Sequence, residues 1–467
     1  MKNFLIYGMV AMCTLMFSCS GNKKNNRAEE QALEKGKIIS KVKCLKNRTL
    51  NYAAYIPSTY SEDKKYPVIF CFDPSGNGVT PVEILMDDAE KLGYILVGSN
   101  VSKNGLAWDI IADHYDVLLA DVTERLSVDS ARIYTCGFSG GSRVASSIAI
   151  LKGGISSVIG CSAGLPQLKE AIKTKFDYIG FAGSDDMNYA EMVNLDGALE
   201  KNNIRHQLVV FEGTHAWPPK EVLSEAFTWM ELHAMRDKKK PEDKDYINNK
   251  LLEYTGQLDE VKKSGSKYKE YLLTKKMVTY FKGLADIAAL EESLKKLQDN
   301  AAVKSAIDNA ILNLKKELAM QQKYGPKIRT ESAAWWKNEV AYLNKFIAMS
   351  RNEDEKHIVK RVLEYLSLSA FSASSSLYNQ NKFVDAEHYI EIYSIVDSDN
   401  PEPAFMKAQL AARKNDADQT LEQLKKAASL GFAERSRVDN DTIFMKFKEK
   451  KGFSNIMDLI SENKNKK

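Results

Sequence analysis

The feature that most constrains this chain is a regular alternation of short apolar runs with amphipathic stretches between residues 36 and 235. From the third run onward the apolar runs are rich in Val, Ile, Phe and Tyr and are separated by helical stretches. Continuous apolar strands joined by helices predict a mostly parallel sheet covered on both faces. The first two runs are joined by a short connection at Asn47 and Arg48, which predicts an antiparallel hairpin at one edge. The eight strand candidates are residues 37–46, 50–56, 67–72, 93–99, 132–138, 156–161, 178–183 and 207–211.

The strand pattern stops after Arg236. Residues 237–244 are charged, contain Pro241 and lack apolar side chains, which is typical of a linker or a solvated helix start. Beyond them, apolar residues recur every three or four positions, for example in residues 301–321 and 333–349. We therefore expect an eight-stranded α/β domain at 37–235, followed by an all-α helical region.

Part of the helical region resembles a tetratricopeptide repeat. Residues 382–389 followed by 399–402 resemble one unit, and Ala386 lies 35 positions before Leu421, close to the 34-residue period of that family. The resemblance implies a helical domain at 236–366 and repeat-like helices at 367–467. The alternative is a set of generic helical hairpins. Either arrangement more often holds a protein partner than performs chemistry.

The N-terminal residues have the pattern of an export signal. Lys2 precedes an apolar run at 4–17, whose 14 residues are too few for a bilayer core that needs about 20. Cys19 and a polar stretch follow, and this resembles the lipobox and tether of a bacterial lipoprotein. The resemblance implies a signal peptide at 1–18, an acylated Cys19, a tether at 19–36 and a lipid anchor in the cell envelope, at the outer membrane. The alternative is a plain signal peptide with a chance cysteine.

Charge and cysteine content exclude some partners. The chain has 66 Lys and Arg against 62 Asp and Glu, and this small excess does not indicate a nucleic-acid groove. After Cys13 and Cys19 the remaining cysteines lie inside apolar runs without the spacing of a zinc site. We expect them to be buried free thiols.

A candidate nucleophile lies between a strand and a helix. The segment 137–141 reads Gly-Phe-Ser-Gly-Gly and connects the strand at 132–138 to a helical stretch at 142–151, as a nucleophile elbow requires. Small residues are needed at both ends of this motif because a side chain there would strike the neighbouring strand. Ser139 is the predicted nucleophile, with the start of the helix supplying N–H groups and a positive dipole end.

The hydroxyl of Ser139 needs a base, and His215 is the candidate among six histidines because it follows the last strand. The acid that orients it should follow the strand at 178–183, where Asp186 is the first choice and Asp185 the second. The order Ser, Asp, His is that of α/β-hydrolases.

Other site residues are predicted from loop position. Gly140 is the expected first donor to the oxyanion. The second is expected after the third strand, where Pro74 has no N–H and Ser75 is the better candidate. His-Gly would be expected where this chain has Asp73 and Pro74. Candidates to line an open substrate cleft are Trp217, Trp108, Asn100 and Asn104.

Residues 37–235 resemble an α/β-hydrolase of the group that contains polyhydroxybutyrate depolymerase-like and feruloyl or acetyl xylan esterases. The resemblance is carried by residues 129–134 leading to 137–141, by 183–186 and by 213–218. In that group the acid lies three positions after the glycine, which supports Asp186.

The resemblance implies a serine esterase that acts on carboxylic esters, including acyl groups on carbohydrates, without a metal or an organic cofactor. The alternatives are a peptidase or thioesterase with the same triad, and an envelope scaffold lipoprotein with an inactive hydrolase domain.

Overall fold

The computed structural model describes residues 33–166 and 172–464. Within them, eight strands form one sheet in the order β1-β2-β4-β3-β5-β6-β7-β8. β1 pairs antiparallel with β2, and β2 pairs antiparallel with β4, whereas all later pairs are parallel. The predicted sheet and its edge hairpin are therefore confirmed. The strands are β1 (Ile38–Lys43), β2 (Asn51–Tyr55), β3 (Tyr66–Phe72), β4 (Ile95–Ser99), β5 (Val128–Phe138), β6 (Ser157–Cys161), β7 (Asp177–Gly183) and β8 (His206–Phe211).

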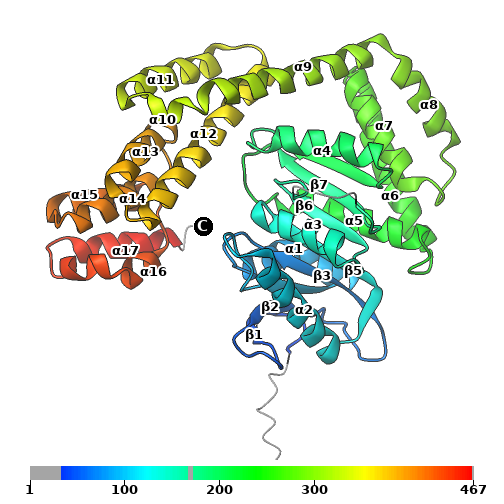
Figure 1. The fold of residues 1–467 in the computed structure, drawn as a ribbon. Helices are drawn as coiled ribbons and strands as arrows, with labels where there is room; N and C mark the ends of the chain where they lie inside the picture. The colour runs from blue at the N-terminus through cyan, green and yellow to red at the C-terminus, as the bar shows by residue number, and fades with distance from the viewer. Residues whose placement is uncertain (1–32, 167–171, 465–467) are drawn as a thin grey trace, which may run out of the picture.

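Helices cover both faces of this sheet (Figure 1). Side chains of a strand alternate between the faces, so Ile69 of β3 joins one apolar core and Phe70 joins the other. The first core contains α1 and α5, and the second contains α2, α3 and α4. These helices are α1 (Val79–Leu92), α2 (Trp108–Arg125), α3 (Gly140–Leu151), α4 (Tyr189–Lys201) and α5 (Lys220–Arg236). The thiols of Cys44, Cys71, Cys136 and Cys161 are free and buried, as predicted.

After β8 the regular elements of the described chain are helices, which confirms the expected all-helical second part. In Figure 1 they extend as an arc beside the α/β part. They are α6 (Lys244–Lys263), α7 (Lys267–Phe281), α8 (Ala288–Asp299), α9 (Ala301–Tyr324), α10 (Lys327–Thr330), α11 (Ala333–Met349), α12 (Glu353–Asn379), α13 (Phe383–Val396), α14 (Glu402–Arg413), α15 (Ala417–Ser429), α16 (Arg435–Asn440) and α17 (Phe453–Lys464), with the 3-10 helix η1 (Thr442–Phe447) between the last two.

The expected boundaries at 235/236 and 366/367 stay predictions, and apolar clusters extend across both positions. Tyr254 of α6 and Tyr280 of α7 belong to the same apolar core as Trp229 of α5, so these helices continue the α/β core. The second boundary falls inside α12, where Leu366 and Ala370 are buried in one cluster. A change in composition marks where strands give way to helices, but the burial of apolar faces decides which elements pack as one body.

The later helices form hairpins, since α12 packs against α13 and α14 packs against α15. The tetratricopeptide resemblance of these pairs stays a prediction. No helix in the described parts of the chain is both long and apolar enough to cross a membrane. The predicted signal peptide and Cys19 lie outside the described residues.

Candidate active site

Ser139 occupies a sharp turn between β5 and α3. Its backbone has φ 51° and ψ −120°, a conformation that a side-chain-bearing residue adopts only when the surrounding structure enforces it. A Cβ on Gly141 would lie 2.0 Å from the carbonyl oxygen of Phe72 in β3, and one on Gly137 would lie 2.1 Å from the carbonyl oxygen of Gly141. The predicted clash with a neighbouring strand is therefore found at Gly141, whereas a side chain at Gly137 would strike the start of α3 instead.

The start of α3 places donor groups beside this hydroxyl. Gly140 is the first residue of the helix, and the N–H groups of a first helical turn have no acceptor within the helix. The helix dipole adds partial positive charge at the same end. A negative oxygen formed next to Ser139 would thus meet a favourable field.

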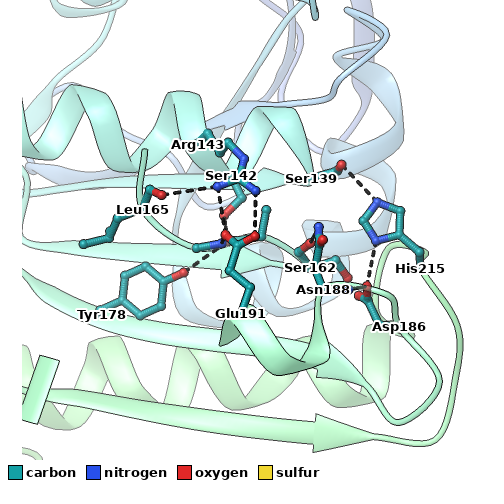
Figure 2. A network of polar contacts seen from close by, with 12 residues as sticks. Ser139, Ser142, Arg143, Ser162, Leu165, Tyr178, Asp186, Asn188, Glu191 and His215 are labelled. Atoms are coloured by element: carbon teal, nitrogen blue, oxygen red, sulfur yellow. Dashed lines mark hydrogen bonds and ion pairs between the residues drawn. The ribbon is translucent and has the colours of Figure 1, made fainter. Parts of the chain in front are cut away.

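The structure brings Ser139, His215 and Asp186 together from three loops at the carboxyl edge of the sheet (Figure 2). Nε2 of His215 lies 3.0 Å from Oγ of Ser139, and Nδ1 lies 2.8 Å from Oδ1 of Asp186. The same Oδ1 accepts the N–H of Asn188 at 2.8 Å. Asp186 is fully buried, whereas the His215 side chain keeps 17% of its surface exposed. Its imidazole therefore contacts a buried carboxylate on one side and an accessible hydroxyl on the other.

Asp185 has different partners. Its Oδ1 lies 2.5 Å from Nδ1 of His357, and its Oδ2 accepts a hydrogen bond from Nζ of Lys360 at 2.9 Å. Both of these residues belong to α12. Of the two adjacent aspartates, only Asp186 contacts His215.

A polar network joins α3, α4 and the loop after β6 near Ser139 (Figure 2). Arg143 of α3 donates two hydrogen bonds of 2.8 Å to Glu191 of α4, and Glu191 accepts the N–H of Gly164 at 2.8 Å. A bidentate pair of this kind sets orientation as well as distance. Asn188 donates from its amide to the carbonyl oxygen of Ser162 at 2.8 Å, which joins the acid loop to the loop after β6.

The loop after β3 differs from the expectation for an oxyanion donor. The N–H of Ser75 donates to Oδ1 of Asp73 at 2.9 Å, so it has an acceptor within its own turn. Aspartate forms such turns because its short side chain reaches a backbone N–H two residues later. Oδ2 of Asp73 accepts the indole N–H of Trp217 at 2.9 Å. Asp73 therefore ties this loop together and joins it to the loop of His215.

Two of the four predicted cleft residues lie near Ser139. A Cβ on Gly140 would lie 1.8 Å from Oδ1 of Asn104, so this exposed carboxamide covers the start of α3. The half-buried Trp217 ring lies 5.5 Å from the ring of Phe138, the residue before Ser139.

The other two predicted cleft residues, Asn100 and Trp108, make contacts that support the fold. Asn100 accepts the N–H of Gly78 at 3.0 Å and donates to Ser40 and Asn51, which uses its carboxamide to hold loops together. Trp108 is half-buried and packs against the core on the α2, α3 and α4 face.

Residues of α12 border the site, although their sequence pattern gives no sign of this. His357, Lys360, Arg361 and Glu364 all contact the loop at 184–187 that carries Asp186. Their spacing of three and four positions places them on one face of a helix. A polar helix face is common on a solvated surface, so nothing in the sequence connects it to a loop more than 170 residues earlier.

A cluster of possible metal ligands and a cavity lie next to the loop at 184–187. Asp185, Glu212 and His357 present ligand atoms within 4.8 Å of one another, but Lys360 already neutralises Asp185, which counts against a cation there. A cavity of about 1040 Å³ lies between β8 and helices α7, α9 and α12. Its lining includes Ser184 but none of Ser139, Asp186 and His215.

No protein-family model and no curated protein matches the chain. Solved structures similar to it include S-formylglutathione hydrolase (FrmB) from Staphylococcus aureus, at 15% identity over 39% of this chain and 90% of that chain, with a TM-score of 0.33. The feruloyl esterase module from Clostridium thermocellum, a serine-to-alanine mutant complexed with sinapinate, is 13% identical over 41% and 86%, with a TM-score of 0.35. An esterase from Thermogutta terrifontis is 15% identical over 40% and 87%, with a TM-score of 0.34.

Proposed function

We propose that the chain is a serine hydrolase that cleaves carboxylic esters through Ser139, His215 and Asp186. The observation that supports this most directly is the imidazole of His215, with one nitrogen 3.0 Å from the Ser139 hydroxyl and the other 2.8 Å from Asp186. Such an arrangement converts a weak hydroxyl nucleophile into an effective one.

The reaction has two steps. Nε2 of His215 takes the proton of Ser139 as its oxygen attacks the ester carbonyl, and the resulting imidazolium gives that proton to the departing alcohol. The buried carboxylate of Asp186 holds the Nδ1–H tautomer and stabilises the imidazolium. Water, activated by the same imidazole, then attacks the acyl-enzyme and releases the acid.

The oxyanion of each tetrahedral intermediate needs donors that are not already bonded. Gly140 supplies one through its N–H at the start of α3. The carboxamide of Asn104 lies against Gly140, and its NH₂ group is the proposed second donor in place of the Ser75 N–H, which Asp73 occupies.

The proposed substrates are esters whose acyl group is presented at an open site, including acyl groups on carbohydrates. Asn104 is exposed and Trp217 is half-buried beside Phe138, which suits a polar ester with a flat or sugar-like part. A peptidase or thioesterase would use the same three residues, so a substrate panel must separate these classes.

The test compares the full chain with Ser139→Ala and with a remote exposed control, Ser264→Ala. A fluorophosphonate probe should label the wild type and Ser264→Ala but not Ser139→Ala, and hydrolysis of p-nitrophenyl acetate should follow the same pattern. Equal labelling of Ser139→Ala would refute the nucleophile. Absence of labelling in all three would instead favour an inactive scaffold. A panel of acetylated and feruloylated sugars, peptides and thioesters then identifies the class.

We also propose that Cys19 carries a lipid anchor that holds the protein at the bacterial envelope, and that the helical part binds a protein partner. Both rest on sequence patterns alone. Metabolic labelling with radioactive palmitate should mark the wild type but not Cys19→Ser, and equal labelling would refute the anchor.

A further inference from the structure

The loop that carries Asp186 is held between two parts of the chain. On one side, the loop is hydrogen-bonded to β8 and to the loop after it. The N–H of Ser184 donates to the carbonyl oxygen of Phe211 at 2.7 Å, and that of Asp185 donates to the carbonyl oxygen of Gly213 at 2.8 Å. On the other side lies α12, from the helical part. The position of Asp186 therefore depends on both halves of the protein.

Arg361 makes the most buried of the α12 contacts. Its Nη1 donates to the carbonyl oxygen of Ser184 at 2.7 Å, and its guanidinium lies 4.3 Å from the ring centroid of Tyr189. Glu317 of α9 accepts from its Nε at 2.8 Å and is itself fully buried. A buried charge persists only with well-placed partners, so this pair fixes α9 and α12 against the loop.

Glu364 lies one turn further along α12 and contacts the backbone of the same loop. Its carboxylate accepts the N–H of Met187, the residue after Asp186, at 3.3 Å. Burial raises the pKa of Glu364 to about 7 and the charge of Asp186 adds to the rise, whereas His215 and the backbone N–H groups of Met187 and His215 lower it. The hydrogen bond to Met187 places the Glu364 carboxylate against the backbone next to Asp186.

We propose that Glu364 is a positioning residue for the triad, through which α12 of the helical part holds the loop of Asp186 in its working position beside His215. This inference rests on the proposed function. Within the described part of the chain, Glu364 makes no hydrogen bond to Ser139 or to the reacting atoms, so it acts by fixing the backbone of Met187. The helical part is then required for hydrolysis, and a partner that moved α12 would change activity.

The test uses the full chain with three variants. Glu364→Ala removes the acceptor oxygens, Glu364→Gln keeps one acceptor in nearly the same shape, and Glu353→Ala is the matched control. Glu353 belongs to the same helix, is exposed and, among the described residues, bonds only to Lys356. Displacing a triad member by about 1 Å costs about a hundredfold in rate, so even partial loosening should be measurable.

For Glu364→Ala we expect kcat to fall at least about tenfold while KM stays within about twofold, because substrate binding does not involve Glu364. Glu364→Gln should recover kcat to within about threefold of the wild type, and Glu353→Ala should match the wild type. Unchanged kcat in Glu364→Ala would overturn the proposal, as would equal losses in the alanine and glutamine variants.

Amide hydrogen exchange gives a readout that does not require activity. The amides of residues 184–188 and 213–216 should exchange faster in Glu364→Ala than in Glu353→Ala, with the rest of the sheet unchanged. Faster exchange in a chain whose wild type hydrolyses no ester would refute the proposed function and leave the positioning role standing. Unchanged exchange at these amides would refute the positioning role even in an active esterase.

Discussion

The indole Nε1 of Trp217 lies 2.9 Å from Oδ2 of Asp73, which joins the loop after β3 to the loop that carries His215. Asp73 keeps only 7% of its surface exposed, and its other oxygen accepts the N–H of Ser75. A buried carboxylate needs its hydrogen bonds, so each partner contributes to the stability of the pair of loops. The loop that departs from the expected His-Gly pattern thus serves as a support for the base.

Trp217→Phe should destabilise the protein and weaken hydrolysis together. It removes the donor to Asp73 but keeps most of the ring, which leaves a buried charged oxygen with one partner fewer, at a cost of about 1–3 kcal/mol. Trp108→Phe is the matched control, because Trp108 is also half-buried, packs against the core and makes no side-chain hydrogen bond to the described residues. Thermal unfolding and ester kinetics measure both effects. Equal shifts in the two variants would show that ring volume alone matters.

Substitutions of the adjacent residues Asp185 and Asp186 should differ sharply in their effect on kcat. Asp186→Asn presents an amide to Nδ1 of His215 and disrupts the required tautomer, so we expect kcat to fall by about 10³–10⁴. Asp185→Asn alters contacts with Lys360 and His357 only, and we expect a fall below about tenfold. Steady-state kinetics on one chromogenic ester measures both. A larger loss in Asp185→Asn would reverse the assignment of the acid.

The sequence predicted the parts of this fold and site that depend on local patterns. Alternating apolar runs predicted the sheet, and the glycines around Ser139 predicted the turn, because both follow from backbone geometry within a few residues. Chain order and strand ends predicted which loops would bring Ser139, Asp186 and His215 to one edge.

Contacts between distant segments were beyond such patterns. Glu364 looks like any charged residue on a helix face, and only the packing of α12 places it against Met187. Likewise, the hydrogen bond from the N–H of Ser75 to Asp73 depends on the side-chain rotamer of Asp73, which the sequence does not show. The extent of α12 across residues 366 and 367 was also beyond the sequence pattern, since a repeat pattern indicates helices but not their lengths.

Glycine-to-alanine substitutions at Gly141 and Gly256 should change the free energy of unfolding in opposite directions. In Gly141→Ala the new Cβ would lie 2.0 Å from the backbone of Phe72, which cannot move without distorting β3, so we expect a loss of several kcal/mol and of activity. In Gly256→Ala, within α6, the Cβ meets nothing within 4 Å. Alanine is the better helix former, so this variant should gain about 1 kcal/mol. Urea unfolding measures both, and a stable, active Gly141→Ala would contradict the steric account of the turn.

Glu364 should also make stability depend on pH. Its pKa is raised from 4.5 to about 7, chiefly by burial, so the folded state binds a proton that the unfolded state has already lost in this interval. The stabilisation from this group is therefore complete below about pH 4.5 and is lost as the pH rises through 7, by up to about 3 kcal/mol. Glu364→Gln cannot ionise and should lack this component. We expect the free energy of unfolding of the wild type, measured in urea relative to Glu364→Gln, to decrease between pH 5 and pH 8. A constant difference across that range would mean that Glu364 is already ionised in the folded protein at pH 5.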